Sequence, residues 1–247
     1  MPYSALFILL MSTRNWFIKL MKGEPFHNKR TKSPWIIDES KCLSIEEVAI
    51  LREYCTKIKE HGLERRKFSL VRNWFMTELG LNAGLRVEEM ASLRHGQCFL
   101  EKGKSSIVIT GKGEKRRAIW ISEGFRKTCL AYFEYKHDFG YSSKTDEYVL
   151  NNLAGGKISK RSLQKFFKSI IEKAGLPGHY HVHCLRHTYT TLLLTASNHN
   201  YRFAQKQLGH SSLRTTQVYA GVVEQQGRKA LEKLLSIKVH RSDPKGY

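Results

Sequence analysis

The sequence predicts an α+β fold that is mostly helical, with one small antiparallel β-sheet or hairpin. Two observations lead to this prediction. Helix-capping signals followed by apolar residues at helical spacing recur along most of the chain, while a β-rich stretch appears between residues 105 and 122. The length of 247 residues and a hydrophobic content of 41% allow a sizeable core.

The beginning of the chain reads as a connecting segment. Residues 22–41 are polar and basic, and Pro25 and Pro34 interrupt them. We therefore expect an N-terminal segment with a linker over residues 1–40. A domain over residues 41–247, ending in a tail, follows it.

Helices dominate the first part of this domain. Ser44, with Glu47 three positions later, is typical of a capping box at a helix start. The apolar stripe expected on that helix consists of Ile45, Val48, Leu51, Cys55 and Ile58. A second helix is expected through Phe68, Val71, Phe75 and Leu79, with a break at Gly84. The segment "LRVEEMASL" then begins a third helix.

The pattern changes in the middle of the chain. "SSIVIT" and "RAIWIS" are β-rich runs around the basic turn "GKGEKR", which predicts a hairpin. Helical spacing returns after Ser122, through Phe125, Leu130 and Phe133. The next predicted helix begins at Ser159, has Leu163, Phe166, Ile170 and Ile171 inward, and ends at Gly175. Short helices are expected from His183 to about Leu235.

The charge balance predicts a polyanionic partner. The chain has 42 Lys and Arg against 22 Asp and Glu, a net charge of +20. Because the basic residues are spread along the chain, we expect a folded basic surface that binds nucleic acid, with an anionic membrane surface as the second candidate. The apolar N-terminal run is too short to span a bilayer. The five cysteines include no CxxC pair, which predicts reduced thiols in a cytoplasmic protein.

Several residues match the needs of metal-free phosphodiester cleavage, namely cations for the phosphate oxygens, a nucleophile and a proton donor. Arg86 follows a glycine turn at a helix start, and Lys112 lies in the hairpin turn. His183 and Arg186 are three residues apart, hence on one helical face. The last candidates of this kind are His210 and Tyr219. Each alone has an ordinary structural explanation.

Together and in this order, these residues resemble the tyrosine recombinase family, which includes the phage integrases and the Xer-type resolvases. The resemblance covers roughly residues 40–225 and is strongest in "GLRVEEMASL", "HCLRHTYTTLLL" and "LGHSSLRTTQVYAGV". It implies that Arg86, Arg186 and His210 bind the scissile phosphate. It further implies that Lys112 is the general acid, that His183 transfers protons, and that Glu89 supports the site from behind. Tyr219 would be the nucleophile.

The resemblance also implies an activity and partners. We expect a site-specific DNA recombinase or integrase that acts through a 3′-phosphotyrosyl intermediate, without cofactor or metal. Its partner would be double-stranded DNA, on which it forms a homo-tetramer. Residues 1–40 would be a truncated remnant of the family's core-binding domain, whose role an accessory DNA-binding protein could supply. The alternatives are a DNA-binding accessory protein or decayed integrase, and a topoisomerase IB-like relaxing enzyme.

The histidine run "GHYHVHCLRH" leaves one further alternative. His179, His181 and His183 alternate as zinc ligands on a strand would. However, no acidic or cysteine ligand pair accompanies them, and Arg186 would repel a divalent cation. We therefore interpret His183 as a phosphate-site residue, His179 and His181 as loop or DNA-facing residues, and His187 as a buried structural partner.

Overall fold

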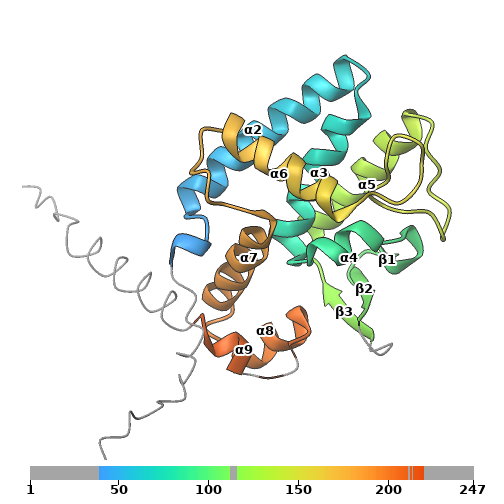
Figure 1. The fold of residues 1–247 in the computed structure, drawn as a ribbon. Coiled ribbons are helices and arrows are strands. Elements are labelled where there is room, and N and C mark those ends of the chain that lie inside the picture. Colours follow the sequence, from blue (N-terminus) through green and yellow to red (C-terminus); the bar gives the residue numbers. More distant parts are fainter. Residues whose placement is uncertain (1–38, 112–115, 211, 213, 220–247) are drawn as a thin grey trace, which may run out of the picture. The chain divides into compact units, whose positions relative to one another are not determined.

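The computed structural model describes residues 39–111, 116–210, 212 and 214–219, which all belong to one compact unit, residues 36–247. Residues 1–38 lie outside this part, so the role predicted for residues 1–40 remains a prediction. Within it the fold is mostly helical with a small antiparallel sheet, as predicted (Figure 1). The helices are η1 (Glu39–Lys41), α2 (Ile45–Glu64), α3 (Phe68–Ala83), α4 (Val87–Ser92), η2 (His95–Gln97), α5 (Glu123–Asp138), α6 (Lys160–Lys173), α7 (Val182–Ala196), α8 (Tyr201–Leu208) and α9 (Arg214–Gln217).

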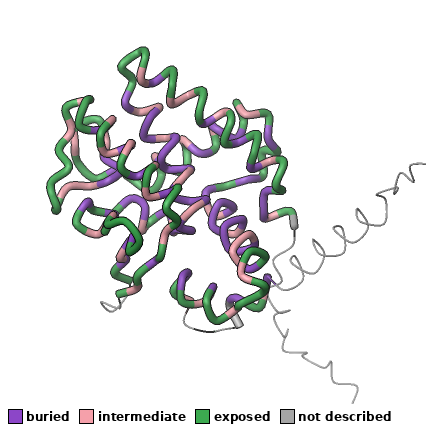
Figure 2. The backbone as a smooth tube through the Cα atoms, turned by 180° about the vertical axis from the view of Figure 1, so that it is seen from behind, coloured by how far each residue is buried: buried purple, intermediate pink, exposed green. Residues whose placement is uncertain are grey.

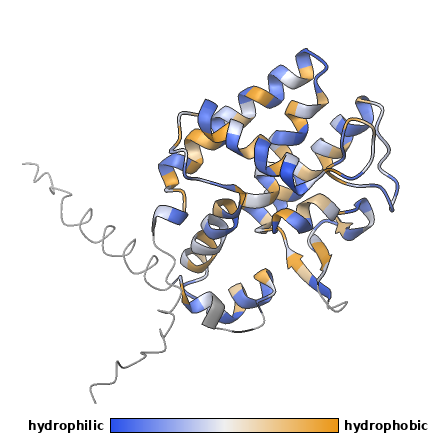
Figure 3. Ribbon diagram, viewed as in Figure 1, coloured by the Kyte–Doolittle hydropathy of each residue, from blue (hydrophilic) through white to orange (hydrophobic). Residues whose placement is uncertain are grey.

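The start of α2 confirms the predicted capping box. The Ser44 hydroxyl accepts from the Glu47 backbone N–H at 3.1 Å, and the Glu47 carboxylate accepts from the Ser44 N–H at 2.7 Å. Ile45 was expected in the buried stripe, but it is 72% exposed. Ile45 is the first residue of α2, so it lies at the end of the stripe that Val48 and Leu51 continue. Figure 3 shows apolar and polar segments mixed along α2, as expected for a surface helix.

The sheet contains one strand more than the predicted hairpin. Strands β2 (Ser106–Thr110) and β3 (Arg116–Trp120) pair antiparallel, with Ile107 opposite Ile119. The short strand β1 (Cys98–Phe99) adds to the free edge of β2 and gives the order β1-β2-β3. Alternate side chains of a strand point to opposite faces, so buried Ile107, Ile109 and Ile119 mark the face toward the core.

Helices α5 and α6 begin where the sequence predicts, at the caps Ser122 and Ser159. On α5 the buried positions are Phe125, Cys129, Tyr132 and Lys136, which follow helical spacing. Leu130, one of the apolar residues through which the helical spacing was expected to run, is not among them and is 37% exposed. Two of the four buried positions are Cys129 and Lys136, and neither residue type is strongly hydrophobic. The sequence therefore did not indicate which face of this helix is buried.

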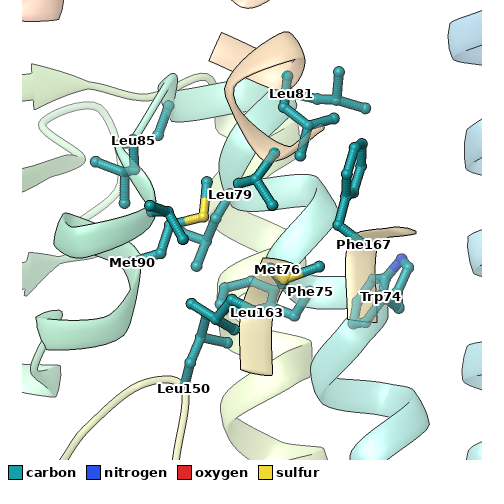
Figure 4. Packing of buried hydrophobic residues seen from close by; sticks show 14 of the residues in the cluster. Trp74, Phe75, Met76, Leu79, Leu81, Leu85, Met90, Leu150, Leu163 and Phe167 are labelled. Atoms are coloured by element: carbon teal, nitrogen blue, oxygen red, sulfur yellow. The ribbon is translucent and has the colours of Figure 1, made fainter. Parts of the chain in front are cut away.

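One hydrophobic cluster connects most of these elements. Met76 and Leu79 of α3 meet Met90 of α4 and Leu163 and Phe167 of α6 (Figure 4). Figure 2 shows buried stretches alternating with exposed ones along the same helices, so each helix contributes one face to the core. No helix in the described part of the chain is long and apolar enough to cross a membrane.

The C-terminal helices form a smaller cluster. Helix α7 is longer than the short helices predicted here, and its second half packs with α8 and the segment after α9. The buried members of this cluster are Cys42, Leu194, Ala204 and Tyr219. Helix α8 also contacts the sheet, because the Gln207 side chain accepts from the Trp120 backbone N–H at 3.0 Å. Residues 220–235, the end of the stretch in which short helices were expected, lie outside the described residues.

Candidate active site

Arg86 is positioned by the turn between α3 and α4. Gly84 ends α3 in the left-handed conformation, with φ at 58°. A Cβ at this position would lie 2.3 Å from the Tyr189 ring, so glycine is required for two reasons. The turn makes Arg86 the residue that precedes α4, with Glu89 one turn later. The Glu89 carboxylate accepts from the Arg86 backbone N–H at 2.8 Å and from its guanidinium at 2.9 Å.

Glu89 also binds a residue that the sequence analysis did not single out. Arg117 of β3 donates from its two terminal nitrogens to the two carboxylate oxygens of Glu89, at 3.0 and 2.8 Å. The side chains of Glu89 and Arg117 are only 12% and 14% exposed, whereas that of Arg86 is 40% exposed. Burial raises the pKa of Glu89, but the hydrogen bonds from Arg117 and the Arg86 backbone outweigh it and hold the pKa below its ordinary value. Glu89 is therefore an anion that joins two arginines.

A weak signal for Arg117 exists in the sequence. It lies two residues before the buried Ile119, so strand alternation places it on the inward face. The neighbouring basic residues in "GKGEKRR" conceal that position. Its side chain passes close to Gly209, where a Cβ would lie 2.4 Å from the Arg117 Cδ.

Arg186 is more deeply buried than Arg86. It is buried on α7 and donates to the Gly84 carbonyl at 2.5 Å and to the Leu208 carbonyl at 2.8 Å. It thereby ties the turn before Arg86 to the end of α8. Burial, and next the charge of Arg86, lower the pKa of Arg186 to about 10, so it remains a cation at neutral pH.

His210 follows α8 and contacts Arg186 directly. Its Nε2 lies 3.1 Å from Arg186 Nη2, and its Nδ1 lies 2.9 Å from the hydroxyl of the buried Thr216. Because arginine only donates, Nε2 accepts, and the ring proton belongs on Nδ1. Burial and the charge of Arg186 lower the pKa of His210 to about 4, which agrees with a neutral ring.

His183 and Tyr219 complete the set that the structure describes. His183 lies one turn before Arg186 on α7, and burial, followed by His181, lowers its pKa. Tyr219 is 3% exposed, and its hydroxyl lies 2.7 Å from Nδ1 of His187. Burial raises the pKa of Tyr219 to about 12, so the phenol is protonated at neutral pH. His187 is thus half-buried beside the predicted nucleophile.

Two further features of the sequence belong to this region, namely Lys112 and the alternating histidines. Lys112 lies outside the described residues, so its role stays a prediction. The alternating histidines do not converge, because His179 Nε2 contacts the Ser40 carbonyl at 2.9 Å while His181 precedes α7 as its cap. Within the described residues, no three His, Cys, Asp or Glu side chains are grouped as metal ligands.

The geometry combines the features that phosphate chemistry needs. Arg186 donates to the carbonyl of Gly84, two residues before Arg86, and His210 lies beside Arg186. His183 and Tyr219 lie close enough to both arginines that the charges of Arg86 and Arg186 act to lower the pKa of each. A guanidinium pair can hold a phosphate and stabilise the charge that develops on it during attack by a nucleophile.

Comparisons with known proteins point in one direction. The phage integrase family matches residues 44–226. Tyrosine recombinase XerC of Caldanaerobacter subterraneus subsp. tengcongensis is 33% identical over 163 residues, which are 66% of this chain and 44% of that protein. XerC of Escherichia coli O1:K1 / APEC is 36% identical over 151 residues, which are 60% of this chain and 48% of that protein. The chain spans about half the length of the curated relatives it matches.

Solved structures agree on the fold. The XerH site-specific recombinase, in a post-cleavage complex bound to palindromic difH substrate, matches with a TM-score of 0.63 and 28% identity, over 77% of this chain and 52% of that one. The XerA recombinase matches with a TM-score of 0.63 at 22% identity, over 78% of this chain and 64% of that one.

Proposed function

The chain belongs to the phage integrase family, and from this premise we propose that it is a site-specific DNA recombinase. In this proposal it cleaves and rejoins strands of double-stranded DNA through a 3′-phosphotyrosyl intermediate. The observation that carries the proposal is the convergence of Arg86, Arg186 and His210 around the Gly84 turn. XerH, which is 28% identical, was solved on its difH substrate, and the net charge of +20 suits a DNA partner.

Each residue has a chemical role in this proposal. Arg86 and Arg186 bind the non-bridging oxygens of the scissile phosphate. His210 binds the phosphate beside Arg186 once its Nε2 carries a proton, because the neutral ring accepts there from Arg186. Glu89 accepts hydrogen bonds from Arg86 and from Arg117 of β3, and thereby holds Arg86 in position against the sheet. His183, one turn before Arg186, transfers protons at the phosphate.

The covalent step uses Tyr219 and Lys112. The Tyr219 oxygen attacks phosphorus, and the 5′ oxygen leaves with a proton from Lys112. Because the phosphotyrosyl bond preserves the phosphodiester energy, rejoining to another strand needs neither a cofactor nor a metal. The relatives are named recombinases, which favours strand exchange over a topoisomerase IB-like activity. The full set of residues favours an enzyme over a DNA-binding accessory protein.

A covalent-trapping experiment tests this function. The protein is incubated in EDTA with nicked suicide substrates drawn from the DNA that flanks its gene. We expect a covalent protein–DNA adduct from the wild type and none from Tyr219→Phe, with DNA binding retained by both because only the nucleophilic oxygen is removed. An adduct from Tyr219→Phe would show that the nucleophile is wrong. If the wild type formed no adduct in EDTA and formed it again when zinc was added, the alternating histidines would have to be interpreted as a zinc site.

We further propose that the protein is monomeric when free and forms a homo-tetramer on DNA. The proposal rests on the tail, where residues 223–235 have apolar positions in a charged segment, and on the family resemblance, in which this segment docks on a neighbouring subunit. Deleting residues 224–247 should leave binding to one site intact and remove the larger complexes in native gels. Tetramers from the truncated protein would contradict this assembly, as would a stable tetramer of the intact protein without DNA.

A further inference from the structure

The face of α7 that carries His183 and Arg186 includes one more titratable side chain. In a helix, residues at i, i+3, i+4 and i+7 share a face, and positions 183, 186, 187 and 190 follow this spacing. His187 is the histidine of this set to which the proposed mechanism gives no role. It lies half-buried, directly beside the proposed nucleophile.

The contact between His187 and Tyr219 is close. Nδ1 of His187 lies 2.7 Å from the Tyr219 hydroxyl oxygen, a normal distance for a hydroxyl donor. The ring centroids are 5.9 Å apart and the ring planes are inclined by 45°. Since Tyr219 is almost fully buried, bulk water has little access to the hydroxyl, and His187 is in place to receive its proton.

The protonation states determine the direction of this hydrogen bond. Burial lowers the pKa of His187 to about 4, and the charges of His183, His181, Arg186 and Lys41 add to this effect. The imidazole is therefore neutral at neutral pH, while the phenol keeps its proton. A neutral imidazole has one acceptor nitrogen. The Tyr219 hydroxyl consequently donates to Nδ1, and the ring proton of His187 is on Nε2.

We infer that His187 accepts the proton of Tyr219 when that residue attacks the scissile phosphate, a role that rests on the function proposed above. The Tyr219 oxygen forms a bond to phosphorus, and the bond from phosphorus to the 5′ oxygen breaks. The phenolic proton moves to Nδ1 of His187, while the 5′ oxygen takes a proton from Lys112. Rejoining runs the same transfers in reverse. His183, one turn earlier on α7, transfers protons at the phosphate oxygens and not at the nucleophile.

DNA binding itself makes His187 a better base. The bound phosphodiester brings a negative charge next to Arg186, and this charge offsets the positive charges that lower the pKa of His187 in addition to its burial. The pKa of His187 therefore rises when the substrate is present. The charge that develops on the phosphate during attack stabilises the imidazolium further.

Single-turnover cleavage of a suicide substrate tests the role. His187→Asn retains a polar atom near the position of Nδ1 but cannot take up a proton, and His187→Gln serves as a second variant. We expect covalent adduct to form about 100-fold more slowly or worse in both, because a general base contributes at least that factor. DNA affinity and the thermal unfolding midpoint should stay close to those of the wild type. A cleavage rate near that of the wild type, or a faster one, would overturn the inference.

A more acidic nucleophile separates proton transfer from positioning. Tyr219 is replaced with a fluorinated tyrosine by amber suppression, in the wild type and in His187→Asn. Because a fluorinated phenol loses its proton more easily, the defect of His187→Asn should shrink. An equal defect with both nucleophiles would mean that His187 only positions the ring, and would overturn the inference.

A substrate with sulfur in place of the bridging 5′ oxygen shows whether His187 acts on the nucleophile or on the leaving group. A thiolate leaves without a proton, so this substrate should rescue Lys112→Ala but not His187→Asn. Rescue of His187→Asn would assign His187 to the leaving group and overturn the inference. If the wild type formed no adduct on either substrate, the proposed function would fail instead. An adduct from the wild type with a normal His187→Asn rate would refute the His187 role alone.

Discussion

Replacing Glu89 with alanine should destabilise the whole fold as well as the site. The substitution removes the carboxylate that accepts from Arg86 and from both terminal nitrogens of Arg117. Within the described residues the buried Arg117 Nε already lacks a hydrogen-bond partner. In Glu89→Ala the Arg117 guanidinium would therefore be a nearly buried cation without a counter-charge.

The expected magnitude follows from this burial. Breaking a buried ion pair by removing one partner costs about 3–5 kcal/mol, because the remaining charge is left uncompensated. For a chain of this size each kcal/mol lowers the unfolding midpoint by roughly 2–4 °C. Glu89→Ala should thus unfold about 6–20 °C below the wild type. Arg117→Ala should cost less, since the Glu89 carboxylate keeps its hydrogen bonds from the Arg86 backbone N–H and guanidinium.

A double-mutant cycle with urea unfolding measures the interaction. The double variant Glu89→Ala/Arg117→Ala should be about 1–3 kcal/mol more stable than the sum of the single losses predicts. Glu53→Ala is the matched control, because the Glu53–Lys57 pair is 68% exposed on both sides and its loss should have no measurable effect. Additive single losses would refute the coupling. A Glu89→Ala midpoint equal to that of the control would refute the argument from burial.

Two further predictions concern pH and salt. His95 is buried against Lys136, and burial, followed by the Lys136 charge, lowers the pKa of His95 to about 4 from an ordinary value of 6.5. Between these values the unfolded chain binds the proton and the folded chain does not, so stability declines as the pH falls from 6.5 toward 4. His95→Gln should flatten the decline of unfolding midpoints, and an unchanged slope would contradict this. DNA affinity should fall about 10³-fold or more between 50 and 200 mM salt, and a flat response in fluorescence anisotropy would argue against a phosphate-binding surface.

Local signals in the sequence were enough to predict most helices. Ser44, Ser122 and Ser159 each cap the helix that was expected after them, because a cap depends on backbone groups only a few residues away. The strand β1 could not be predicted, since its two residues form a strand only by pairing with β2. Its structure therefore depends on tertiary contacts that no short window contains.

The same distinction applies to the candidate site. Arg86, His183, Arg186, His210 and Tyr219 could be proposed because their residue types and order follow a recognisable pattern. Arg117 could not, because its significance depends on Glu89, which is 28 residues away and on a different element. The role of His187 depends likewise on contact with Tyr219, 32 residues later.

Gly84 shows how one short stretch can determine the geometry between distant arginines. Its left-handed conformation ends α3 and directs Arg86 to the start of α4. Its carbonyl accepts from Arg186, 102 residues later, and its missing side chain leaves room for the Tyr189 ring. Arg186 and Tyr189 are three residues apart on α7, so two positions of that helix are fixed against the same glycine. The glycine of "GLRVEEM" therefore sets the distance between the two arginines proposed to bind phosphate, although it has no side chain that could take part in the chemistry.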